Sequence, residues 1–64
     1  MNRYEAIDEV KTYMRLYDET SFEKIGSGEY WDSGNYDDAF DYGKNVGRIR
    51  TLIQIFALQE EEIA

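Results

Sequence analysis

Two stretches of the chain place apolar residues at the spacing of an α-helix, and this periodicity constrains the fold more than any other feature. Between residues 3 and 17 the apolar stripe consists of Ile7, Val10, Met14 and Tyr17, widened by Tyr4, Ala6 and Tyr13. Between residues 36 and 61 it consists of Tyr42, Val46, Ile49, Ile53 and Phe56. No proline interrupts either stretch, and no segment alternates apolar and polar residues over strand length. We therefore predict an all-α fold.

Local signals set the predicted boundaries of a single domain, residues 1–64. Asn2 and Glu5 have the spacing of a capping box, which places the start of the first helix at residue 3. The segment 20–23 has the same pattern and predicts one short helical turn. Gly43 and Gly47 each cost about 1 kcal/mol inside a helix, so the continuity of the second helix stays open. The predicted architecture is a helical hairpin, with a helix over 3–17, a loop over 18–35 and a helix over 36–61.

The short length of the chain favours stabilisation by a second copy of the chain in a homodimer. A domain of 64 residues buries only about 60% of the surface of its unfolded chain. The chain has no cysteine and no histidine, so disulfides and the commonest zinc ligands are missing, and we expect no cofactor. The second helix is apolar over more than one face, which the shorter first helix should not cover. We therefore expect a homodimer. The residues expected to form the dimer or hairpin core are Val46, Ile49, Ile53 and Phe56.

The net charge of −7 is concentrated in the middle of the chain. Acids and bases balance in residues 1–17 and again in residues 43–64. Residues 18–42 contain Asp18, Glu19, Glu23, Glu29, Asp32, Asp37, Asp38 and Asp41, against Lys24 as the single base. The same segment contains the aromatic residues Phe22, Tyr30, Trp31, Tyr36, Phe40 and Tyr42. An acidic and aromatic middle between two neutral ends is the most informative feature of the composition.

The sequence offers little support for catalysis, so we predict that the chain is not an enzyme. No histidine or cysteine is present to act as base or nucleophile. The cluster Asp37, Asp38 and Asp41 resembles paired carboxylates, but acid–base catalysis also needs a cleft that separates their pKa values. An EF-hand loop starting at Asp32 fails, because Gly43 stands where it needs glutamate. A non-standard calcium or magnesium site among these four aspartates stays open.

One sequence feature favours direct binding to nucleic acid. It is the cluster of Lys44, Arg48 and Arg50 near the middle of the second helix. We expect these bases to pair with Asp37, Asp38 or Asp41, or with acids on the first helix. The net charge of −7 would also repel phosphate groups. We therefore expect no direct nucleic-acid binding.

The acidic middle has two interpretations. In one, the carboxylates keep the protein soluble and the aromatic rings belong to the core. In the other, the carboxylates present a phosphate-like surface to a basic groove, and aromatic side chains anchor the contact. A solubilising role needs no clustering, so the asymmetry favours the second. The expected electrostatic contacts are Asp32, Asp37, Asp38 and Asp41, and the expected anchors are Tyr30, Trp31 and Tyr36.

In its size, acidity, tyrosine content and lack of cysteine, the chain resembles a type of small phage-encoded protein that inhibits host defence. Nucleic-acid mimics that occupy the basic groove of a CRISPR or restriction enzyme belong to this type. The resemblance implies a non-enzymatic inhibitor, anti-CRISPR-like or a DNA mimic, that binds a larger protein with a basic surface. It carries over no site residue. The alternative is a structural or regulatory homodimeric adaptor that works through the apolar face of the second helix.

The sequence predicts a cytoplasmic location. The residues after Met1 contain no apolar segment of the kind found in signal peptides. The longest apolar-rich stretch, residues 52–58, is far shorter than the roughly 20 residues that a membrane span needs. We therefore expect no membrane partner.

Overall fold

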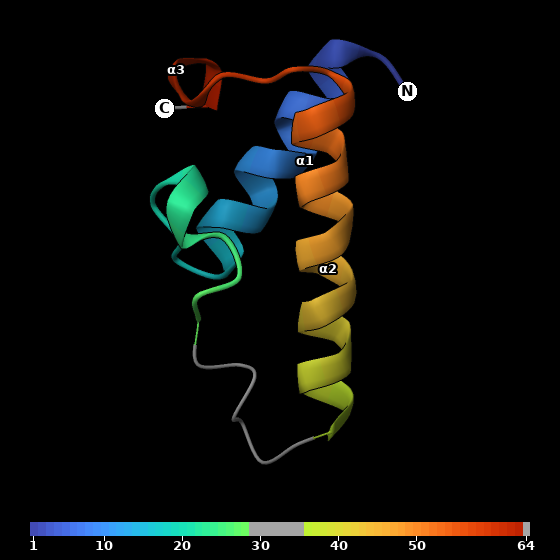
Figure 1. Cartoon of the computed structure of the whole chain (residues 1–64), viewed down its shortest axis with the longest axis vertical. Helices are drawn as coiled ribbons and strands as arrows, with labels where there is room; N and C mark the ends of the chain where they lie inside the picture. Colours follow the sequence, from blue (N-terminus) through green and yellow to red (C-terminus); the bar gives the residue numbers. More distant parts are fainter. Residues whose placement is uncertain (29–35, 64) are drawn as a thin grey trace.

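The computed structural model describes residues 1–28 and 36–63, except for the side chains of Tyr36 and Asp38. Its elements are α1 (Arg3–Leu16), the 3₁₀ turn η1 (Phe22–Lys24), α2 (Tyr36–Ile55) and α3 (Glu60–Ile63). Figure 1 shows α1 beside the upper half of α2, while the lower part of α2 extends past α1. The all-α prediction is confirmed: two main helices pack against each other and a short third helix follows.

The N-terminus of α1 forms as the sequence predicts. The side chain of Asn2 accepts a hydrogen bond from the backbone N–H of Glu5 at 2.8 Å. The side chain of Glu5 in turn accepts one from the backbone N–H of Asn2 at 3.3 Å. This reciprocal pair is a capping box, and it satisfies two backbone donors that the first helical turn leaves without partners.

The C-terminus of α1 is a Schellman motif built without glycine. Asp18 adopts a left-handed backbone, with φ of 54°. The backbone N–H of Asp18 donates to Arg15 O at 3.4 Å, and that of Glu19 donates to Met14 O at 3.0 Å. This geometry folds the side chain of the second residue back onto the helix, where an apolar residue is usual. Here that residue is Glu19, which is only 4% exposed.

The short turn expected near residues 20–23 is present as η1, but its capping differs from the prediction. Ser21 precedes the turn and makes no side-chain capping bond. Instead, the backbone N–H of Phe22 donates to the Glu60 carboxylate at 2.5 Å. The turn is therefore capped by a residue of α3, 38 positions further along the chain.

Helix α2 runs unbroken through Gly43 and Gly47, and it ends at Ile55, six residues before the predicted end at 61. Ala57 takes a left-handed backbone with φ of 48°. The backbone N–H groups of Ala57 and Leu58 then donate to Gln54 O and Ile53 O, which closes a second Schellman motif. The early end has a packing reason, because the turn places Leu58, 4% exposed, in the core.

The core forms between α1, α2 and the segments that follow each of them. Its buried apolar members are Ala6, Val10, Tyr13, Ile25, Tyr42, Val46, Ile49, Leu52 and Leu58. Tyr4, expected to widen the stripe of α1, is instead 84% exposed.

The apolar face of α2 is covered within one chain. Val46 and Ile49 are buried, while Ile53 and Phe56 are partly buried and pack against the same core. Ile25, directly after η1, and Leu58, after α2, belong to this core together with residues of α1.

Candidate functional site

Three of the four predicted electrostatic contacts, Asp37, Asp38 and Asp41, belong to the first turns of α2, at the end of this helix that extends past α1 (Figure 1). Asp37 and Asp41 are exposed and lie one helical turn apart. The backbones of Tyr36 and Asp38 belong to the same first turns of α2, and their side chains are outside the described part. Tyr30, Trp31 and Asp32 lie outside the described residues altogether.

Acidic and basic residues occupy different parts of α2. Its first six residues contain Asp37, Asp38 and Asp41 and no base. Residues 42–55 contain Lys44, Arg48 and Arg50 and no acid. Carboxylates at the start of a helix interact favourably with the positive end of its dipole, so this end tolerates three acids.

Two arginines are engaged in ion pairs that hold the helices together. Arg48 of α2 donates from Nε and Nη2 to the two carboxylate oxygens of Glu9, both at 2.8 Å. Hydrogen bonding from Arg48 lowers the pKa of Glu9, and the same contact raises the pKa of Arg48. Arg3 donates to the Glu62 carboxylate at 2.6 and 2.8 Å and also to the Phe56 carbonyl. The expectation that the basic cluster would pair with an acid on the first helix is confirmed for Arg48.

Two further bases have partners within the chain. Arg50 donates from Nη2 to the carbonyl of Ile25 at 2.8 Å, which ties the turn after η1 to α2. The ammonium of Lys44 lies 5.6 Å from the centre of the Phe40 ring, a cation–π distance.

A buried carboxylate cluster, missed by the sequence reasoning, lies under the turn that follows α1. Glu19 Oε1 accepts hydrogen bonds from the Tyr13 hydroxyl at 2.5 Å and from the Gly26 backbone N–H at 3.1 Å. Glu19 Oε2 accepts one from the Tyr42 hydroxyl at 2.5 Å. The Tyr42 oxygen itself accepts from the Gly28 N–H at 2.9 Å. In the sequence, Glu19 is one of the acids of the charged segment 18–42, whereas the structure places it in the core.

The cluster raises the pKa of both tyrosines that contact Glu19. Burial raises the pKa of Tyr13, and the hydrogen bond to the Glu19 carboxylate raises it further. The same two causes raise the pKa of Tyr42. Buried tyrosine hydroxyls need hydrogen-bond partners, so Tyr13 and Tyr42 at apolar-stripe positions were the available signal for a buried acceptor. The cluster joins the turn after α1 to both main helices.

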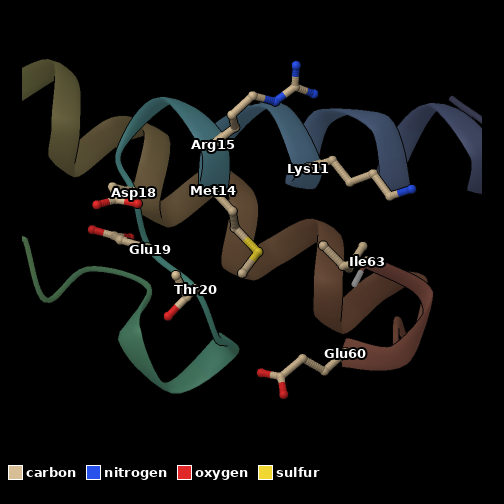
Figure 2. Close-up of a pocket in the computed structure, with 8 residues that line it drawn as sticks. All are labelled: Lys11, Met14, Arg15, Asp18, Glu19, Thr20, Glu60 and Ile63. Atoms are coloured by element: carbon tan, nitrogen blue, oxygen red, sulfur yellow. The ribbon is translucent and has the colours of Figure 1, made fainter.

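Figure 2 shows an open groove between α1, residues 18–20 and α3, with a volume of about 480 Å³. Lys11 and Arg15 extend from α1, and Met14 points into the space between the elements. Asp18 and Glu60 bring opposite charge to the same groove. Within residues 1–28 and 36–63, no group of three potential metal ligands is close enough to hold an ion. The calcium or magnesium site considered from the sequence includes Asp32 and Asp38, whose side chains lie outside the described part of the chain.

A second, smaller groove of about 280 Å³ lies between α1 and α2. Its apolar lining includes Leu16, Tyr17 and Ile49. Asp8 and Glu9 line it from α1, and Asn45 and Arg48 line it from α2. Of these lining residues, Leu16 is 67% exposed, while Ile49 is buried.

Comparisons of the chain with protein-family models, with curated proteins and with solved structures found no match. No helix in the described part of the chain is both long enough and apolar enough to span a membrane.

Proposed function

We propose that the chain is a non-enzymatic binding protein whose acidic surface occludes a basic surface on a larger protein that handles nucleic acid. In this proposal it acts as an inhibitor and a nucleic-acid mimic in the cytoplasm of a bacterial host. Asp32, Asp37, Asp38 and Asp41 make the electrostatic contacts, with Tyr30, Trp31 and Tyr36 as aromatic anchors.

One observation carries the proposal: exposed acids gather at the start of α2, while the bases further along α2 have partners within the chain. Arg3, Arg48 and Arg50 are hydrogen-bonded to protein groups, and Lys44 lies over an aromatic ring. Asp37 and Asp41 are exposed near the start of α2, and the first six residues of this helix contain no base. The start of α2 thus offers a partner a surface with three acids and no base.

Occlusion follows from elementary electrostatics. A surface rich in carboxylates is attracted to a basic groove and competes there with phosphate groups. Burial of tyrosine and tryptophan side chains then supplies the short-range binding energy that charge alone does not. The chain needs no chemical step to inhibit, because it occupies the groove in place of nucleic acid.

The alternative, a homodimeric adaptor working through the apolar face of the second helix, has less support. That face consists of Val46, Ile49, Ile53 and Phe56, and it packs within the single chain. A dimer that uses this face would have only the parts of Ile53 and Phe56 that the core leaves exposed.

The proposal is tested by capture of partners from a bacterial lysate, with identification by mass spectrometry. The wild-type chain is compared with a variant carrying Asp37→Asn and Asp41→Asn. A matched control carries Glu23→Gln and Glu61→Gln, which changes the net charge equally at exposed positions outside α2. We expect the wild type and the control to capture the same basic nucleic-acid-handling protein, and the Asp37/Asp41 variant to lose it. Equal capture by all three proteins would contradict the proposal.

A further inference from the structure

The smaller groove, between α1 and α2, combines an exposed apolar side chain with a concave surface. Leu16 is 67% exposed at its edge, and the partly buried Tyr17 and the buried Ile49 lie within it. The polar groups of the groove are largely satisfied, since Asn45 donates to the Tyr17 hydroxyl at 3.0 Å. An apolar side chain entering from a partner would therefore gain contact with Leu16 without leaving this pair unsatisfied.

Two contacts show how α1 and α2 run along the groove. Glu9 pairs with Arg48, and Tyr17 pairs with Asn45, so α1 and α2 run antiparallel along it. The first contact also neutralises one acid of the lining.

Unneutralised acids flank both ends of this groove. Asp8 lies beside Glu9 at one end. Asp41 precedes Asn45 by one turn of α2, on the same side of the helix, beyond the other end. Neither the Asp8 nor the Asp41 side chain forms an ion pair or hydrogen bond within the described part of the chain.

We infer that this groove binds a basic amphipathic helix of the partner protein. An apolar side chain of that helix lies against Leu16, and its lysines or arginines approach Asp8 and Asp41. A furrow between two packed helices suits a third helix, whose side-chain ridges fit into it. The described residues contain no strand, so no sheet edge competes to bind an extended segment. This inference rests on the proposed function and adds the place and the kind of partner element.

The test uses a synthetic helical peptide of about 15 residues, long enough for appreciable helix formation, with leucine on one face and lysine on the other. A second peptide has the same composition in scrambled order. Each is titrated into isotopically labelled protein, and amide chemical shifts and affinities are measured. The Leu16→Ser variant is compared with Ile55→Ser, because Ile55 is 68% exposed and does not line the groove.

We expect the amphipathic peptide to shift amides of Thr12, Leu16 and Asn45, and to bind more tightly than the scrambled peptide. Leu16→Ser should weaken binding about tenfold, as loss of a buried leucine contact implies, whereas Ile55→Ser should leave it unchanged. Binding that is insensitive to Leu16 but lost with Asp37→Asn and Asp41→Asn would overturn the groove assignment and leave the proposed function standing. Absence of peptide binding would also overturn the inference, as would the same chemical-shift changes caused by self-association of the protein without peptide. The capture of partners from lysate tests the proposed function independently of these outcomes.

Discussion

The hydroxyl of Tyr42 donates a hydrogen bond to the carboxylate of Glu19 at 2.5 Å, across 23 positions of the chain. This contact joins the turn after α1 to the middle of α2, and the hydroxyl of Tyr13 completes it from α1. The Tyr42 ring also packs against the Tyr17 ring in an edge-to-face arrangement, with ring centres 5.1 Å apart. A buried carboxylate thus organises the packing of the two main helices.

Removal of this carboxylate should destabilise the fold strongly. Glu19→Ala leaves the hydroxyls of Tyr13 and Tyr42 and the Gly26 N–H without their acceptor. Each unsatisfied buried group costs about 1–3 kcal/mol, so we expect a loss of at least about 3 kcal/mol in the free energy of unfolding. Glu19→Gln should cost less, because it keeps one acceptor oxygen. Urea denaturation gives the values, with Glu23→Ala at an exposed position as the control, and equal effects of Glu19→Ala and Glu23→Ala would refute this role.

Stability should fall at alkaline pH through the same cluster. The pKa values of Tyr13 and Tyr42 are raised in the folded protein above their ordinary value of 10.0. A raised pKa means that folding favours the protonated hydroxyl, so this stabilisation is complete below pH 10 and is lost as the pH rises further. Denaturation curves at neutral pH and near pH 11 should therefore show a smaller pH effect for Tyr13→Phe than for wild type. Tyr4→Phe, at a position 84% exposed, should keep the wild-type pH effect.

Two glycines should respond to alanine in opposite directions. A Cβ at Gly47 meets nothing within 4 Å, and alanine favours a helix over glycine by about 1 kcal/mol. Gly47→Ala should therefore raise the melting temperature by about 4–8 °C. Gly26 has φ of +89°, and a Cβ there would lie 3.1 Å from Arg50 and 3.2 Å from Val46. Gly26→Ala should lower the melting temperature, and a shift of the same sign for both variants would contradict these backbone assignments.

The end of α2 offers a stabilising substitution. Ala57 holds a left-handed backbone, with φ of 48°, at the position where Schellman motifs prefer glycine. Ala57→Gly removes the steric cost of this conformation, and the net gain should be about 0.5–1 kcal/mol after the extra entropy of the unfolded chain. Differential scanning calorimetry would measure it. A lower melting temperature would mean that α2 continues past Ile55 in solution.

Periodicity and capping predicted the helical class and the start of α1, because both depend on residues close together in sequence. The predicted end of α2 was wrong by six residues, because the left-handed turn falls on Ala57 and no glycine marks it in the sequence. The role of Glu19 was missed for a different reason. Its burial depends on tyrosines 6 and 23 positions away, and local composition shows only another acid in a charged segment.

The affinity of the captured partner as a function of salt concentration tests the central claim most directly. If carboxylates on α2 occupy a basic groove, the affinity should fall steeply as salt rises, and a DNA or RNA ligand of the partner should displace the chain. Asp37→Asn with Asp41→Asn should flatten this salt dependence. An affinity that is equal at low and high salt, with no competition from nucleic acid, would contradict the account and point to an apolar interface.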